Sequence, residues 1–143
     1  MIAKTSRRAR STGGGAARGC VPVQVALAHK HLGGAGFDPP QADVLIMGHI
    51  LHDRNLQEKH LLLQKAFAAL PKHGTLIVYD AMIDDARRRN VMGLWMRLNM
   101  LIETPGGFDY TPADCRGWMR TTGFRKTSVV PLTAVESMVI ATK

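Results

Sequence analysis

A histidine and an aspartate that could perform acid–base chemistry follow a strongly apolar run of the sequence. The run is Asp43-Val-Leu-Ile-Met-Gly48, and His49-Ile-Leu-His52-Asp53 follows it directly. An imidazole has a pKa of about 6.5, so it can accept a proton at neutral pH, and a carboxylate can fix its tautomer. His52 is therefore either a general base or a solvated loop residue. Since adjacent side chains rarely pair, we expect Asp53 to cap the following helix.

Other candidate residues lie further along the chain. Asp80 ends a second apolar run, Thr75-Leu-Ile-Val-Tyr79, and is either a partner of His52 or a turn residue. Asp109 stands in Gly-Gly-Phe-Asp-Tyr-Thr and could likewise be a turn residue. The helical spacing of one mostly apolar stripe predicts core, or an adaptable pocket for a flat organic substrate, in which a buried amide would need a hydrogen-bond partner. Its members are Met92, Trp95, Met96, Asn99 and Met100.

The elements that must position these residues form a βαβ unit. Strands are predicted at residues 43–48 and 75–79, with an amphipathic helix at 56–70 that Asp53 or Asn55 would cap. Such a unit makes a parallel, right-handed crossover, and its ligands bind beyond the carboxyl ends of the strands. His52 and Asp80 would therefore lie at the same edge of the sheet.

The remaining pattern completes an α/β fold with a C-terminal antiparallel hairpin. Further helices are predicted at residues 21–31, 86–103 and 112–122, and further strands at 35–38, 124–132 and 137–142. Gly13-Gly14-Gly15 could cradle a cofactor, although such a loop requires a strand before it and a helix after it.

Composition narrows the class of protein. The chain has 143 residues, 45% of them hydrophobic, which suits one domain, and no apolar stretch long enough to span a membrane. Two cysteines, Cys20 and Cys115, make neither a disulfide framework nor a zinc site, so we expect a cytoplasmic protein. Five of the eight net positive charges lie in residues 1–20, a predicted basic flexible tail. No aromatic residue is interleaved with these charges, so no nucleic-acid binding is expected.

Five segments, in this order, resemble the catalytic domain of S-adenosylmethionine-dependent small-molecule O-methyltransferases of the caffeate, acetylserotonin and polyketide type. The segments are Ala42-Asp-Val-Leu-Ile-Met-Gly-His-Ile-Leu-His-Asp53, Leu70-Pro-Lys-His-Gly-Thr-Leu-Ile-Val-Tyr-Asp80, Leu98-Asn-Met-Leu-Ile-Glu-Thr-Pro-Gly-Gly-Phe-Asp-Tyr-Thr111, Trp118-Met-Arg-Thr-Thr-Gly-Phe124 and Ser137-Met-Val-Ile-Ala141. The resemblance implies a partial Rossmann-like methyltransferase domain over residues 21–143, well matched over 43–143.

The resemblance also implies a function and roles for individual residues. His52 matches the general base, Asp80 and Asp109 match supporting acids, and Asp38 matches the carboxylate that holds the ribose of S-adenosylmethionine. Gly13 and Gly15 fall in the place of the cofactor loop, and Asn99 and Met100 would contact the substrate. The reaction would transfer a methyl group to a hydroxyl of a small aromatic or polyketide-like acceptor, without a metal.

The sequence departs from the family in its first 42 residues. The family's first strand is replaced by Arg-rich sequence, and the interval between Asp38 and Asp43 is too short for the elements that the family places there. The chain therefore resembles a truncated and internally deleted domain, and a non-catalytic remnant that binds a protein partner is the alternative function. We expect strand 43–48 to be unpaired on one side, which would make the chain prone to associate. Whether it forms a homo-oligomer stays open.

Overall fold

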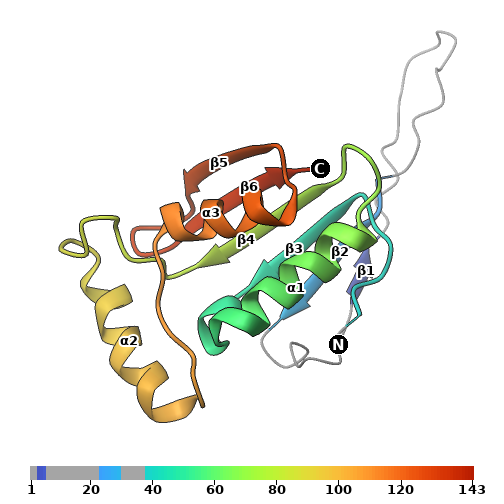
Figure 1. Cartoon of the computed structure of the whole chain (residues 1–143). Helices are drawn as coiled ribbons and strands as arrows, with labels where there is room; N and C mark the ends of the chain where they lie inside the picture. Colours follow the sequence, from blue (N-terminus) through green and yellow to red (C-terminus); the bar gives the residue numbers. More distant parts are fainter. Residues whose placement is uncertain (1–2, 6–22, 30–37) are drawn as a thin grey trace, which may run out of the picture.

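The computed structural model describes residues 3–5, 23–29 and 38–143, which contain one six-stranded sheet (Figure 1). The strand order is β1-β2-β3-β4-β6-β5, in which β2, β3 and β4 are parallel to one another and the outer strands are antiparallel to their neighbours. The bounds are β1 Ala3–Thr5, β2 Val25–His29, β3 Val44–Gly48, β4 Thr75–Asp80, β5 Lys126–Pro131 and β6 Ser137–Thr142. The predicted α/β class, with its C-terminal hairpin, is confirmed.

The predicted βαβ unit is present and joins β3 to β4 through helix α1, Leu56–Ala69. Asn55 caps this helix by accepting a hydrogen bond from the Glu58 N–H, while the Glu58 carboxylate accepts one from the Asn55 N–H. These two bonds satisfy amides that a helix leaves without partners in its first turn. Of the two predicted caps, Asn55 is confirmed and Asp53 is wrong.

Alternate residues of the parallel strands face the main core. Leu45 and Met47 of β3 and Leu76 and Val78 of β4 are buried on the face that packs the helices, whereas the residues between them are half-buried. Figure 1 shows α1 and α3, Pro112–Thr122, side by side on one face of the sheet. Strand β3 is therefore fully buried on one face only.

Helix α3 and the hairpin follow their sequence signals closely. Thr111 caps α3 with Asp114 in a reciprocal pair of hydrogen bonds, and Pro112 occupies the first turn. The helix ends at Gly123, whose φ of +119° lies in the left-handed region that glycine adopts without a steric penalty. Residues 126–131 and 137–142 then pair antiparallel, as predicted.

Two predictions for the N-terminal part are wrong. Residues 25–29, predicted within a helix at 21–31, form strand β2 in parallel register with β3. Because β3 is paired by β2 on one side and β4 on the other, the expected unpaired edge does not exist. Tertiary pairing with a buried strand overrides the weak helical spacing of this short segment. The predicted strand at 35–38 falls largely on residues 30–37, outside the described residues.

Helix α2 begins later than predicted and lies away from the main body of the molecule (Figure 1). It spans Val91–Glu103 instead of 86–103, because the Asp84 carboxylate accepts the N–H groups of residues 88–90 and holds them in a loop. Asn90 then caps the helix. Met100 is buried as predicted, but Met92 and Trp95 are exposed, so the predicted core stripe is wrong for both.

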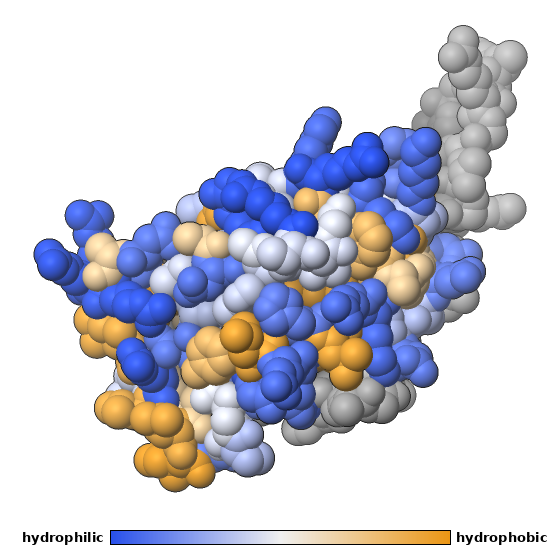
Figure 2. Space-filling view, viewed as in Figure 1, coloured by the Kyte–Doolittle hydropathy of each residue, from blue (hydrophilic) through white to orange (hydrophobic). Residues whose placement is uncertain are grey.

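The exposed side chains of α2 form an apolar face, which is visible as an orange patch in Figure 2. Its members are Val91, Met92, Trp95, Leu98, Leu101 and Ile102. We call these six residues the α2 apolar face. Within the described parts of the chain, no helix is both long enough and apolar enough to cross a membrane.

Candidate active site

The loop after β3 places His52 over the carboxyl edge of the parallel strands. A Cβ at Gly48 would collide with the Tyr79 ring, so any other residue at the end of β3 would require that ring to shift. His49 follows with a φ of +53°, which turns the chain sharply. A single 3-10 turn, Leu51–Asp53, then brings the His52 side chain inward, where it is 7% exposed.

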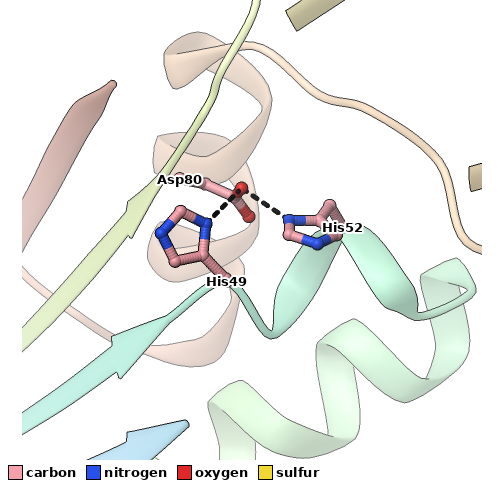
Figure 3. A group of neighbouring side chains, drawn as sticks. All are labelled: His49, His52 and Asp80. Atoms are coloured by element: carbon pink, nitrogen blue, oxygen red, sulfur yellow. Dashed lines mark hydrogen bonds and ion pairs between the residues drawn. The ribbon is translucent and has the colours of Figure 1, made fainter. Parts of the chain in front are cut away.

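Asp80, at the end of β4, is the direct partner of His52 (Figure 3). His52 Nδ1 lies 2.5 Å from Asp80 Oδ1. The carboxylate also accepts the Ala81 N–H at 2.9 Å and the Tyr110 hydroxyl at 3.0 Å. Burial opposes ionisation of Asp80, but the hydrogen bonds from His49 and His52 outweigh it and hold the pKa of this carboxyl well below its usual range. Asp80 is therefore a fixed negative charge.

His49 is a second imidazole on the same carboxylate, and sequence reasoning missed it. Its Nδ1 lies 3.6 Å from Asp80 Oδ1, and its Nε2 lies 3.1 Å from Glu136 Oε1. The ring packs edge-on against Tyr79, with a centroid separation of 5.2 Å. The available signal was a second histidine three residues before His52, at the end of a buried strand.

Asp53 lies beside His52 instead of capping α1. Its Oδ1 is 3.2 Å from His52 Nε2, so adjacent residues do approach here because the 3-10 turn brings both side chains to one side. Each imidazole of the cluster therefore lies between two carboxylates: His52 between Asp80 and Asp53, and His49 between Asp80 and Glu136.

Asp109 is buried at the same rim. Arg97 Nε lies 3.4 Å from one of its oxygens, and Arg87 Nη1 lies 3.8 Å from the other. A cavity of about 10 Å³, room for roughly one water molecule, joins it to the His52–Asp80 pair. The lining residues are His52, Asp80, Ala81, Met82, Met96, Met100, Asp109 and Tyr110. The predicted trio of His52, Asp80 and Asp109 thus shares one cavity.

Of the other predicted site residues that the structure describes, one lies at this cavity and two do not. Met100 lines the cavity, while Asn99 is half-buried on α2 and is not among the lining residues. Asp38 is exposed, and its carboxylate lies 3.0 Å from Lys65 Nζ. Lys65 lies about 13 Å along the axis of α1 from the first residue of that helix. Gly13 and Gly15 lie outside the described residues. The cofactor roles of these three residues remain predictions.

Sequence reasoning also missed a buried lysine near the site. Lys59 Nζ donates to the backbone carbonyls of Arg54 and Phe108 and lies 3.1 Å from the centroid of the Phe108 ring. Burial lowers the pKa of Lys59 to about 7, against the attraction of Asp80 and Asp109. The ammonium group links α1 to the loop that carries Asp109. The amphipathic pattern of α1 gave no signal for it.

Comparisons with known proteins agree with the fold. A family model described as an O-methyltransferase domain matches residues 16–125, and this chain belongs to that family. The tetracenomycin polyketide synthesis 8-O-methyl transferase TcmO of Streptomyces glaucescens is 40% identical over 107 residues, which are 74% of this chain and 32% of that protein. Bovine acetylserotonin O-methyltransferase is 34% identical over 86 residues, which are 60% of this chain and 25% of that protein.

Solved structures show the same likeness. The structure of human N-acetylserotonin methyltransferase in complex with SAM superposes with a TM-score of 0.71 at 26% identity, covering 76% of this chain and 31% of that one. A putative O-methyltransferase from Nostoc punctiforme gives a TM-score of 0.70 at 25% identity, covering 76% of this chain and 34% of that one. This chain thus spans about a third of the length of these structures.

Proposed function

We propose that the protein containing this chain transfers a methyl group from S-adenosylmethionine to a hydroxyl of a small aromatic or polyketide-like acceptor. The names of the relatives support this reaction, since they include a polyketide O-methyltransferase and an acetylserotonin O-methyltransferase. The observation that carries the proposal within this chain is the 2.5 Å contact between His52 Nδ1 and Asp80 Oδ1 at the carboxyl edge of the sheet. His52 is the proposed base.

The partners of His52 define how it would handle a proton. Asp80 is an ionised acceptor, so His52 Nδ1 carries the hydrogen and Nε2 keeps its lone pair. Nε2 can then take the proton of an acceptor hydroxyl, which makes the oxygen a better nucleophile. Asp53, 3.2 Å from Nε2, and Asp80 together stabilise the imidazolium that results. When bound, S-adenosylmethionine supplies an electrophilic methyl group on a sulfonium.

The described residues fit the acid–base half of this reaction and not the cofactor half. Asp38 already pairs with Lys65 on the flank of α1, and the predicted glycine loop lies outside the described residues. The cavity beside His52 has room for about one water molecule, so an aromatic acceptor enters only if lining side chains, such as those of Met96 and Met100, move.

A substitution at His52 tests the assignment. His52→Gln keeps a polar side chain of similar size but cannot act as a base, so we expect turnover to fall by about 10²–10⁴-fold. The affinity for S-adenosylmethionine should change little, because His52 faces the acceptor in this proposal. His60→Gln is the matched control, since His60 lies on α1 beside Trp118. A His52→Gln variant with undiminished turnover would overturn the assignment.

A second candidate function is protein binding by a non-catalytic remnant. The α2 apolar face favours it, because six large apolar side chains are exposed on one helix. Titration of the chain with S-adenosylmethionine by calorimetry separates the two functions: heat of binding supports the methyltransferase, and its absence supports the remnant.

We also propose a cytoplasmic location, which the buried free thiol of Cys115 supports. Cell fractionation tests it.

A further inference from the structure

The His49–His52–Asp80 cluster has the composition and second partners of a metal-binding site. Among the described residues, one potential ligand atom from each of these three side chains lies within 4.8 Å of the others. Two imidazole nitrogens and one carboxylate oxygen, with the remaining positions open, are a donor set that zinc takes in proteins. Figure 3 shows both rings directing a nitrogen toward Asp80.

The second nitrogen of each ring strengthens this interpretation. His49 Nε2 faces Glu136 Oε1 at 3.1 Å, and His52 Nε2 faces Asp53 Oδ1 at 3.2 Å. A histidine that binds a metal through one nitrogen commonly donates the hydrogen of the other to a carboxylate, which fixes its tautomer and raises its basicity. With neutral rings, the five side chains carry three carboxylate charges. The Lys59 ammonium interacts with two of them, Asp80 and Asp53, and one cation offsets only part of this charge, so the cluster attracts a further cation.

We propose that His49 Nδ1, His52 Nδ1 and Asp80 Oδ1 bind a zinc ion, and that this ion inhibits the enzyme instead of serving it. Zinc–nitrogen distances of about 2.0–2.1 Å place tetrahedral ligands about 3.3 Å apart. The His49–Asp80 distance of 3.6 Å already suits this geometry, and the His52–Asp80 distance of 2.5 Å must open by about 0.8 Å as zinc replaces the shared proton. The Tyr110 hydroxyl and Ala81 N–H hold Asp80 in place.

The inhibition rests on the proposed function and follows from the tautomer of His52. As a base, His52 keeps its hydrogen on Nδ1 and its lone pair on Nε2. Zinc on Nδ1 displaces that hydrogen as a proton, and Nε2 takes up one proton from solvent, so the ring stays neutral, no net proton is released, and its one hydrogen now lies on Nε2, facing Asp53. The nitrogen that should accept a proton has become a donor. Zinc and methyl transfer are therefore mutually exclusive.

Zinc binding to the intact chain is measured first, without S-adenosylmethionine, by competition with a chromophoric chelator. The wild-type chain should bind one zinc ion at this cluster. His49→Asn removes a ligand while keeping a residue that tolerates positive φ, and should weaken affinity by about 100-fold or more. Glu136→Gln, which removes the partner of His49 Nε2, should weaken it by roughly 10-fold. His60→Gln, as the matched control, should leave it unchanged.

The outcomes test the zinc site and the proposed methyl-transfer function separately. Equal zinc affinity for the wild-type and His49→Asn chains overturns the site, as does a wild-type chain that binds no zinc. Should circular dichroism show His49→Asn unfolded, unchanged affinity of Glu136→Gln overturns it. Co²⁺ in place of zinc should give the visible absorption of a tetrahedral ion, and an octahedral spectrum counts against the proposal. Zinc binding without any methyl transfer contradicts only the proposed function, whereas transfer that zinc does not inhibit contradicts only the inhibition.

Discussion

Helices α1 and α2 have similar lengths and reversed environments. In α1, of 14 residues, the charged side chain of Lys59 is fully buried, whereas in α2, of 13 residues, Ile102 is 85% exposed. The more apolar helix is thus the less covered one. The difference teaches that hydrophobic content predicts which residues can be buried, and that the neighbouring elements decide which of them are.

The neighbours of each helix explain the reversal. As the crossover between parallel strands, α1 must pack back on the sheet, and α3 lies beside it. Its inward residues Leu62, Leu63 and Ala66 are therefore buried. Helix α2 leaves the sheet after β4, and only Gly93 and Met100 are buried along it. A Cβ on Gly93 would lie 2.8 Å from the Ile83 side chain, so the α2 backbone packs closely against the residues that follow β4 at this point.

The largest expected effect comes from replacing one leucine in each helix with alanine. Leu63→Ala in α1 removes a side chain with no exposed area, and should lower the free energy of unfolding by about 2–5 kcal/mol. Leu101→Ala in α2 removes an exposed side chain and should change it by no more than about 0.5 kcal/mol. Urea unfolding followed by circular dichroism gives both values. Equal losses would mean that α2 is packed in solution.

The buried charge of α1 gives the next largest effect, and it depends on pH. The ordinary pKa of lysine is 10.5, and that of folded Lys59 is about 7, so between these values the unfolded chain binds more protons than the folded one. Burial of Lys59 therefore has no electrostatic cost above pH 10.5, where the group is neutral in both states, and the cost grows as the pH falls toward 7. Between pH 7 and pH 9 the gain should be about 2 kcal/mol.

Lys59→Met removes this titration while filling a similar volume. Its free energy of unfolding, measured by urea at pH 7 and pH 9, should rise by about 2 kcal/mol less than that of the wild-type chain. Lys65→Met is the control, because Lys65 lies on the same helix and its ammonium pairs with the exposed Asp38. A wild-type chain and a Lys59→Met chain with parallel pH profiles would contradict the buried-charge explanation.

A smaller effect concerns the two asparagine caps. Asn55→Ala should lower the free energy of unfolding by about 1 kcal/mol, because α1 unfolds with the core. Asn90→Ala removes the cap of α2 and two hydrogen bonds to the carbonyls of Met82 and Val135. We expect it to act locally, as faster hydrogen exchange in the first turns of α2 with a smaller global loss. Mass-spectrometric exchange distinguishes the two; a global loss from Asn90→Ala as large as that from Asn55→Ala would contradict it.

The same contrast shows how much of the fold could be predicted from sequence. The unit from β3 to β4 and the helix α3 carry local signals of strand period, capping residues and turn glycines, and these were sufficient. Residues 25–29 were misassigned because the short run Val-Ala-Leu-Ala-His fits either period, and only pairing with β3 decides between them. The start of α2 was misplaced because Asp84 bonds three later amides, a contact that no helical pattern reveals.

The site could be predicted in part for a similar reason. His52 and Asp80 follow parallel strands, and the carboxyl ends of such strands meet at one edge, so their proximity follows from topology. The pairing of His49 with Glu136 could not be predicted, because it depends on the antiparallel register that brings β6 against β4. The burial of Lys59 depends likewise on a distant contact, because one of its two carbonyl partners, Phe108, lies 49 residues away in the sequence, whereas the other, Arg54, is local.

The smallest effect on stability, and the most direct test of the comparison, is a pair of polar substitutions on the α2 apolar face. Leu101→Gln combined with Ile102→Gln should leave the free energy of unfolding within about 0.5 kcal/mol of wild type, because both side chains face solvent. Binding of a dye that fluoresces on exposed apolar surface should fall in the same variant. Met100→Gln is the control on the buried side of the helix, and should destabilise the chain strongly. If the double variant loses as much stability as Leu63→Ala, the α2 apolar face is covered in solution, and the two helices differ only in which molecule covers them.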